Sequence, residues 1–316
     1  MLKKLVLLLL VTLPLTTLAA SDNAATVKVV PVKVGKHSYY VQGIPGAASA
    51  ANQGYMSNAG FVITPAGVVV FDSLGSPPLG ESLIAQIRKL TPAPIKRVIV
   101  SHYHADHVYG LQAFKAVGAE IWAHEGGKEY FASDELERRL AQRREELFPW
   151  VDENTKVLLP DRWLNADEDF ELGGVSFAVR FVGPAHSPED LALFIKQDSV
   201  LFAGDLVFKG RVPFVGGADS KSWLASLDKL LAFPAKVMVP GHGSVSRQPK
   251  KDLTLTRDYL NYLRKTMGKA VEELTPFEEA YAKVSWKKYA KLPAFNEANR
   301  ANAYNTYILM EKESLK

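Results

Sequence analysis

Three histidines and an aspartate fall within six residues of the chain: His102, His104, Asp106 and His107. They follow the apolar run Val98–Val100, which is typical of a buried strand. Alternate residues of an extended segment point the same way, so His102, His104 and Asp106 can share one face, and a turn would place His107 close by. Imidazole nitrogens and carboxylate oxygens are zinc ligands. Four of them in one loop exceed what one catalytic zinc usually takes from a single segment, so the motif predicts two metal ions.

Three further candidate ligands come later in the chain, each at the end of a predicted strand: His186, Asp205 and His242. Ligands of an α/β sheet gather at the carboxyl ends of its strands, which favours a shared site. Glycines adjoin two of these residues, and glycine allows the backbone to approach a site closely. An isolated histidine or an isolated Gly-Asp pair is usually structural, so the prediction depends on all three sharing this context.

The two remaining histidines are predicted to be structural. His37 lies in an early strand among aromatic residues, where a buried or half-buried histidine is ordinary. His124 follows the strand Ala119–Ala123 and could face the site, but the predicted ligand positions are already filled.

The composition removes several classes of protein. Among 316 residues there is no cysteine, which excludes disulfides, a thiolate nucleophile, iron–sulfur ligation and a cysteine-based zinc site. The net charge is +4, and it falls to +2 without residues 1–20, which hold two lysines and no acid. This balance and the lack of a basic stripe with interleaved aromatics argue against nucleic-acid binding.

The first twenty residues have the features of a secretory signal. Lys3 and Lys4 precede the apolar run Leu5–Leu15, and Thr17-Leu18-Ala19 resembles a small-x-small cleavage site. The run is interrupted by Pro14 and is shorter than the ~20 residues that span a bilayer, so a retained anchor is the less favoured alternative. We therefore predict a protein that is exported, to the periplasm, and not inserted in a membrane after cleavage.

The remaining chain alternates strands and helices. Short β-like runs occupy residues 27–71, a strand–helix alternation of the α/β kind follows, and β-patterns return from Trp163 to Val239. Ser133–Phe148 carries charges of both signs and one thin apolar face, which is typical of a solvated surface helix. Helical periodicity dominates the end of the chain, so we predict a main domain over residues 21–250 and a helical extension over 251–316.

The seven candidate ligands, in this order and with this spacing, resemble those of the metallo-β-lactamase fold superfamily over about residues 30–245. The resemblance implies an α/β fold built as an αββα four-layer sandwich. It assigns the first metal to His102, His104 and His186, the second to Asp106, His107 and His242, and a bridging role to Asp205. The bridging aspartate is similar to that of glyoxalase II-like hydrolases. The segments Phe202–Phe208 and Asn299–Tyr304 look similar to exported members associated with sulfur oxidation and quinoproteins.

The activity expected from this site is hydrolysis. Two zinc ions ~3.5–4 Å apart can share one water and lower its pKa towards neutrality, which provides a hydroxide nucleophile. The substrate would be a small molecule with an ester, thioester, lactone or lactam bond, and Asp106 would move the proton as a catalytic acid–base. For the rim of the cleft we predict Tyr103, Tyr109, Asn58 and the Phe208–Phe214 segment, with Lys209 and Arg211 as candidate contacts to an anion.

Two other functions are compatible with the motifs. Persulfide dioxygenases of this fold also carry a His-x-Asp-His segment and a following Gly-Asp, and their single iron would be held here by His102, His186 and Asp205. A periplasmic accessory protein that keeps the metal fold without catalysis is the third possibility. Metal analysis and oxygen uptake separate iron from zinc chemistry, and a substrate panel separates an enzyme from an accessory protein.

Overall fold

The structure is a computed structural model that describes residues 23–315. The predicted signal sequence, residues 1–20, lies outside this range. Within the range, none of the helices combines the length and apolar character that a membrane span requires.

Seven strands from the first half of the chain form one sheet, in the order in which they occur along the sequence. They are β1 (Pro31–Lys33), β2 (Ser38–Val41), β3 (Ala59–Thr64), β4 (Gly67–Phe71), β5 (Ile95–Ile99), β6 (Glu120–His124) and β7 (Arg162–Leu164). Pairing is antiparallel from β1 to β4 and parallel from β4 to β7. Pro31 lies in the edge strand β1, which suits proline because it has no amide hydrogen for a central ladder.

Five strands from the second half form the other sheet, in the order β12-β11-β10-β9-β8. They are β8 (Glu168–Leu172), β9 (Val175–Phe181), β10 (Leu191–Ile195), β11 (Val200–Phe202) and β12 (Val237–Val239). Gly173 and Gly174 connect β8 to β9 with φ angles of 54° and 77°. Both values lie in the left-handed region that a tight hairpin turn requires.

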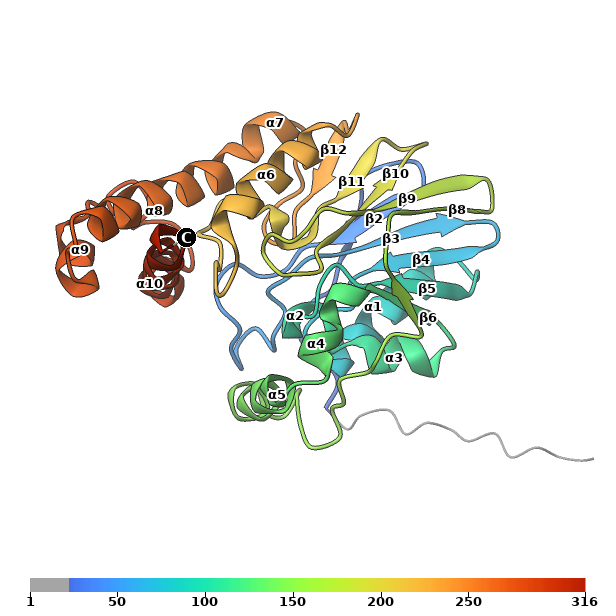
Figure 1. The fold of residues 1–316 in the computed structure, drawn as a ribbon. Helices are drawn as coiled ribbons and strands as arrows, with labels where there is room; N and C mark the ends of the chain where they lie inside the picture. Colours follow the sequence, from blue (N-terminus) through green and yellow to red (C-terminus); the bar gives the residue numbers. More distant parts are fainter. Residues whose placement is uncertain (1–22, 316) are drawn as a thin grey trace, which may run out of the picture.

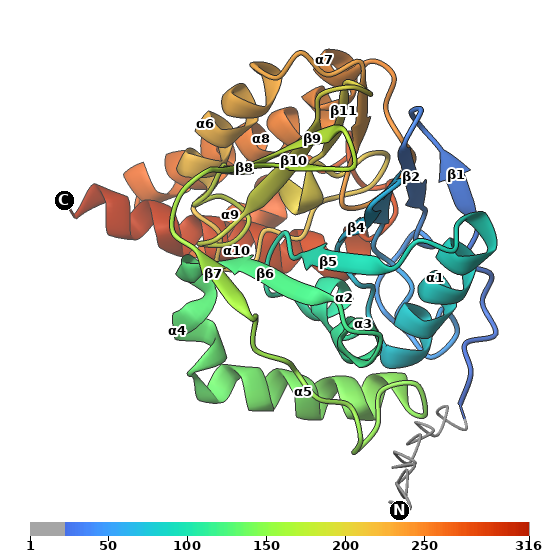
Figure 2. The same ribbon diagram turned by 90° about the vertical axis from the view of Figure 1, so that its right-hand side faces the viewer.

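The two sheets pack face to face, and helices cover both outer faces (Figure 1). Phe71 of the first sheet meets Phe202 of the second within the buried apolar layer between them. Figure 2 shows α1 (Pro77–Leu90) and α3 (Leu111–Ala116) on the first sheet and α6 (Ser220–Leu231) and α8 (Thr254–Glu272) on the second. This αββα arrangement confirms the predicted fold class.

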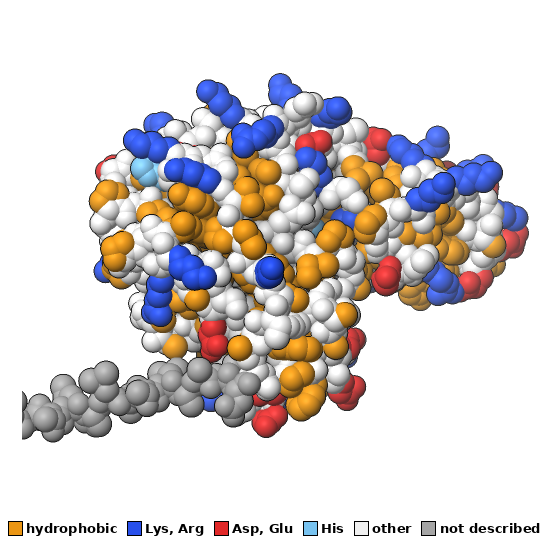
Figure 3. Space-filling model, turned by 180° about the vertical axis from the view of Figure 1, so that it is seen from behind, with side chains coloured by type: hydrophobic (Ala, Val, Ile, Leu, Met, Phe, Trp, Pro, Cys, Tyr) orange, Lys and Arg blue, Asp and Glu red, His pale blue; other side chains and the backbone are white. Residues whose placement is uncertain are grey.

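The end of the chain is helical, with α7 (Pro249–Asp252), α8, α9 (Phe277–Lys283) and α10 (Phe295–Ser314). These helices project from one side of the sandwich, and Figure 3 shows this arm from behind, with lysine and arginine side chains dispersed over the face. Their buried residues, such as Leu260 and Ala303, belong to the same apolar core as Leu206 and Trp223. The helical extension therefore packs directly on the second sheet's helix layer, and a domain boundary at residue 250 stays a prediction.

Candidate metal centre

The four candidate ligands after β5 lie on both sides of a change from extended to helical backbone. His104 lies in extended backbone and occupies the N-cap position of α2 (Ala105–Val108), with φ −66° and ψ 146°. Asp106 and His107 are already in that helical turn. The expectation that Asp106 shares a face with His102 and His104 is therefore wrong, because the chain becomes helical one residue before it.

The other three candidates come from loops at the ends of strands. His186 lies in the turn between β9 and β10, Asp205 in the 3₁₀ turn Gly204–Leu206 after β11, and His242 directly after β12. A Cβ atom on Gly241 would lie 2.0 Å from Oδ1 of Asp205. Only glycine allows these two loops to approach so closely.

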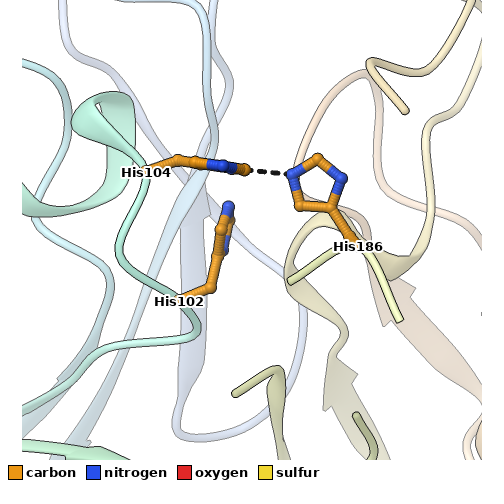
Figure 4. Close-up of side chains that lie close together, drawn as sticks. All are labelled: His102, His104 and His186. Carbon is orange, nitrogen blue, oxygen red and sulfur yellow. Dashed lines mark hydrogen bonds between the residues drawn. The ribbon is translucent and has the colours of Figure 1, made fainter. Parts of the chain in front are cut away.

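The structure brings all seven candidates together in three overlapping groups whose potential ligand atoms lie within 4.8 Å of one another. The groups are His102, His104 and His186; His102, His107 and Asp205; and Asp106, His107 and His242. Figure 4 shows the imidazoles of the first group converging on one point. Nδ1 of His104 and Nε2 of His186 face each other across 2.8 Å, and His102 points between them.

Asp205 lies between the histidines of the two predicted metal sites. Its Oδ2 is 3.5 Å from Nε2 of His186 and 4.0 Å from Nε2 of His102. Its Oδ1 is 3.1 Å from Nε2 of His107, and Oδ2 is 3.2 Å from Nε2 of His242. This position is the one that a carboxylate shared by two cations would occupy.

The donor atoms fit a metal centre. Five buried atoms of the candidate ligands have no hydrogen-bond partner within residues 23–315: His102 Nε2, Asp106 Oδ2, His107 Nε2, His186 Nδ1 and Asp205 Oδ1. A buried polar atom without a partner is costly, and such atoms call for an explanation such as a bound ion. Nitrogen and oxygen donors without sulfur suit zinc, iron and other divalent ions of intermediate hardness.

Asp72, at the end of β4, orients the loop from behind. Its Oδ2 lies 2.8 Å from Nδ1 of His107, and its two oxygens accept from the amide and hydroxyl of Ser101 at 2.7 Å and 2.8 Å. The Ser101 hydroxyl in turn lies 2.9 Å from Nδ1 of His102. Both imidazoles are thus held with Nε2 towards the centre, as metal-ligating histidines usually are. Asp72 is not among the candidates predicted from the sequence, although it follows an apolar strand as Asp205 does.

His242 is oriented by the backbone. Its Nδ1 lies 2.7 Å from the carbonyl oxygen of Met56, which can only accept, so Nδ1 carries the hydrogen and Nε2 faces the centre. The guanidinium of Arg211 lies 3.3 Å from the same Nδ1 and donates to the carbonyl of Gly46 at 2.9 Å. Arg211 is buried behind His242 and ties the 46–48 loop, which lines the cavity, to the centre.

Burial and charge set the protonation of the ligands. Burial and the neighbouring histidines His107 and His104 lower the pKa of His102 well below its usual value. Burial also lowers the pKa of His186 to about 4. Burial alone would lower the pKa of His107, but the carboxylates of Asp205, Asp106 and Asp72 outweigh it and raise that pKa well above its usual value. The part around His102 and His186 thus favours neutral nitrogen donors, whereas the part around His107 favours a positive charge.

A cavity of about 750 Å³ opens over the centre. Candidate ligands on its wall are His104, Asp106, His186, Asp205 and His242. Tyr103 and Phe214 line it as predicted. The other predicted rim contacts are wrong. Tyr109 is buried in the core, and Asn58 is buried and holds the carbonyls of Pro240 and Gly243. Lys209 pairs with Asp252, and Arg211 lies behind His242.

Helix α5 (Asp134–Leu147) forms one wall of the cavity with Glu135, Arg139, Gln142, Arg143 and Glu146. The prediction of a simply solvated surface helix is therefore wrong for this face. The two excluded histidines stay outside the three groups. Nδ1 of His37 donates to the carbonyl of Ile63, and His124 stacks on Phe181 with ring centroids 4.0 Å apart.

The opposite wall depends on α10. The side chain of Asn302 accepts from the amide of Val215 at 2.8 Å and donates to the carbonyl of Pro213 at 2.7 Å. It also donates to the hydroxyl of Tyr259, which donates to Asn299. This buried network fixes the Phe214–Ala218 segment beside the centre, so the last helix builds part of the cavity.

The chain matches a known protein family. The profile of the metallo-beta-lactamase superfamily matches residues 52–242, which contain all seven candidate ligands. The chain belongs to the metallo-beta-lactamase superfamily. Membership implies a divalent metal, and the donor set described above fits one.

Relatives within the superfamily have different activities. A linear primary-alkylsulfatase of Pseudomonas is 28% identical over 253 residues, 68% of this chain and 47% of that protein. Metallo-beta-lactamase IND-1 of Chryseobacterium indologenes is 24% identical over 76% of this chain and 92% of its own length. Hydroxyacylglutathione hydrolase GloC of Haemophilus influenzae is 32% identical over 52% of this chain and 76% of its own length. These superfamily relatives support a metal-dependent hydrolase.

Solved structures share the superfamily fold at low identity. The sec-alkylsulfatase Pisa1 of Pseudomonas superimposes with a TM-score of 0.68 at 19% identity over 88% of this chain. Metallo-beta-lactamase IND-7 superimposes with a TM-score of 0.57 at 20% identity over 73% of it. The chain spans about half the length of the alkylsulfatases it matches.

Proposed function

We propose that this member of the superfamily is an exported binuclear zinc hydrolase that cleaves an ester, thioester, lactone or lactam bond of a small molecule. The position of Asp205 carries the proposal. Its two oxygens lie near His102 and His186 and also near His107 and His242, at the wall of the cavity. His102, His104 and His186 would hold one ion, Asp106, His107 and His242 the other, and Asp205 would bridge them. Bound zinc would polarise the scissile carbonyl and lower the pKa of an attacking water.

The residues around the ions would position and protonate the reactants. Asp106 lines the cavity, and its buried Oδ2 has no hydrogen-bond partner in the described part of the chain. Its carboxylate can therefore accept the proton of the attacking water and return it to the leaving group. Burial would raise the pKa of Asp205, but His242 and His107 lower it well below its usual value, so its carboxylate stays ionised. The hydroxyl of Tyr103 stays protonated, since burial raises its pKa, and it can donate to a substrate oxygen.

The test is the metal content of the purified protein followed by turnover of a substrate panel. We expect two zinc ions per chain, activity that a chelator removes and zinc restores, and turnover of at least one ester, thioester, lactone or β-lactam. One iron per chain with oxygen consumption on a persulfide would establish the dioxygenase instead. Inactivity of the fully loaded protein on the whole panel would favour the accessory role.

A second candidate activity is hydrolysis of sulfate esters. It is favoured by the alkylsulfatase relative and by the alkylsulfatase structure, whose likeness extends over more of this chain than that of IND-7. The panel therefore includes dodecyl sulfate and 4-nitrophenyl sulfate. Turnover of these two and of no acyl substrate would replace the first proposal with the second.

Export is supported by residues 1–20, with Lys3 and Lys4 before the apolar run Leu5–Leu15. We expect the protein expressed from its full gene to be recovered from the periplasm with a new N-terminus near residue 20. Intact mass and N-terminal sequencing measure this directly. A cytoplasmic protein that retains Met1 would contradict it.

A further inference from the structure

Helix α5 has three faces with different surroundings. Leu136, Leu140 and Leu147 are buried against the sandwich. A second stripe lines the cavity, as described above, while Arg138 is exposed on the remaining side. The lining residues recur at intervals of three and four, which places them on one helical face. Two of them, Arg139 and Arg143, are the cavity's lysine or arginine residues within the part of the chain that the structure describes.

The guanidinium of Arg139 is held over a stack of rings that leads to the metal centre. It lies 5.6 Å from the centroid of the Tyr130 ring, and Tyr130 stacks on Tyr103 with centroids 3.9 Å apart and planes inclined by 9°. The edge of Tyr103 meets the candidate ligand His104 at 5.0 Å. Arg139 is therefore positioned along the same wall as the centre and is not a freely moving surface residue.

Both arginines keep donors for a ligand. Nη2 of Arg139 donates to Glu135 at 2.8 Å, and Nη1 of Arg143 donates to Glu146. These are each guanidinium's hydrogen bonds among residues 23–315, whereas a guanidinium has five N–H donors. Their side chains are only 28% and 26% exposed, and both line the cavity. The glutamates thus fix the two cations in place without using all of their donors.

The opposite wall carries two acids, Asp219 and Glu297. Asp219 caps α6 by accepting from the amides of Lys221 and Ser222. Glu297 also lines this wall, and its charge acts on the buried guanidinium of Arg211, whose pKa burial lowers. Between them the wall is formed by the apolar and glycine residues 214–218. The cavity therefore has Arg139 and Arg143 on the α5 side, and an apolar and glycine segment between two acids on the other side.

We infer that Arg139 and Arg143 bind a carboxylate that the substrate carries at a distance from the bond that is cleaved. The inference deepens the proposed function and rests on it. Arginine binds carboxylates through paired, charge-assisted hydrogen bonds, which give orientation as well as affinity. A substrate held at both ends would place its scissile bond over the metals and its acidic end against α5.

The test compares two esters, 4-nitrophenyl butyrate and mono-4-nitrophenyl glutarate, whose acyl chains have the same three carbons next to the ester carbonyl. The second differs only in its terminal carboxylate. We expect the wild-type KM to be lower for the glutarate ester, and R139Q to raise that KM by roughly 10-fold or more, as loss of a charge-assisted hydrogen bond would. The R139Q/R143Q protein should show the larger effect, while kcat and the KM for the butyrate ester stay within about twofold.

The matched control is R138Q, which removes the same charge from the neighbouring, exposed position of the same helix. It should leave both esters unaffected. Equal changes in R138Q and R139Q would reduce the effect to long-range electrostatics and overturn the inference. Unchanged turnover of the butyrate ester shows that each variant is folded. Mono-4-nitrophenyl succinate and adipate extend the series. The chain length at which R139Q raises the KM most shows how far the arginines lie from the scissile bond.

A binding measurement separates failure of this inference from failure of the proposed function. If no ester is hydrolysed, the affinities of 3-sulfanylpropanoate and 3-sulfanylpropan-1-ol for the zinc-loaded protein are measured by calorimetry. Both present a thiolate to zinc, and only the first has a carboxylate. We expect the carboxylate to strengthen binding about 10-fold in wild type and R138Q but not in R139Q/R143Q. Equal affinities in wild type, or no binding of either compound, would overturn the inference.

Discussion

The two halves of the candidate centre differ in charge although one short loop supplies both. His102, His104 and His186 contribute nitrogen alone, and burial lowers the pKa of each. The half around His107 contains the carboxylate of Asp106 and has Asp72 directly behind it. A single backbone change, from extended at His104 to helical at Ala105, sends consecutive ligands to these different surroundings.

In the proposed binuclear enzyme, this difference would make the two metal sites inequivalent. The three-histidine half has donors that remain neutral into the acidic range, so protons compete weakly for them. The carboxylate half attracts positive charge of any kind, a proton included. Asp205 lies close to both halves, so removal of its carboxylate should remove the difference between them in how they attract cations.

The largest expected effect therefore comes from Asp205→Asn, which keeps the shape and removes the charge. We expect metal content to fall from two ions per chain to one or fewer, and kcat to fall at least ~10²–10³-fold as preorganised electrostatic stabilisation is lost. Metal analysis and steady-state kinetics measure both. Asp198→Asn is the control, because Asp198 accepts from the amides of His37 and Ser38 at the other end of the sheet. Unchanged metal content and turnover would refute the bridging role.

Asp72→Asn should have an intermediate effect and sharpen the comparison. Asn tolerates the left-handed backbone of this position, where φ is 65°, so the loop should keep its shape. Its amide can accept at one end only, so an N–H group would oppose either His107 or Ser101. We expect metal affinity, measured by competition with a chelator, to fall roughly 10–100-fold, and more for the half that contains His107. Equal loss of metal affinity from both halves would mean that Asp72 acts on His102 through Ser101 as strongly as it acts on His107 directly.

Glu189→Gln should have the smallest effect and act on stability alone. Glu189 stands behind the histidine half, where its Oε1 accepts from the amide of Tyr103 at 2.8 Å. Burial raises its pKa to about 7 from an ordinary 4.5. In the unfolded chain the carboxyl ionises first, so the folded state loses stability as the pH rises from 4.5 to about 7.

Glutamine keeps the acceptor and has no proton to lose. We therefore expect Glu189→Gln to stabilise the metal-free protein by between about 1 and 3 kcal/mol at pH 8 and by little at pH 4.5. Urea unfolding at both pH values measures this, with the exposed Glu125→Gln as the control. A pH-independent change would show that the charge of Glu189 is not the cause.

The ligand loop could be predicted from the sequence because its residue types have no simple structural use at such density. Asp72 could not be separated in this way, since a single aspartate after a strand is common, and its role depends on a pairing across the sheet with Ser101. Arg139 was missed for another reason. Helix α5 carries charges of both signs on two of its faces, and only its packing decides which face meets the cavity rather than solvent.

The network of Asn302 has a consequence for the order in which the protein is made. All the candidate ligands are synthesised before α8 begins, whereas the side chain that fixes the 214–218 wall belongs to the last helix. A growing chain thus acquires its complete set of metal donors while the cavity above them is still open on one side. The cavity over the candidate centre is closed on that side only when α10 docks.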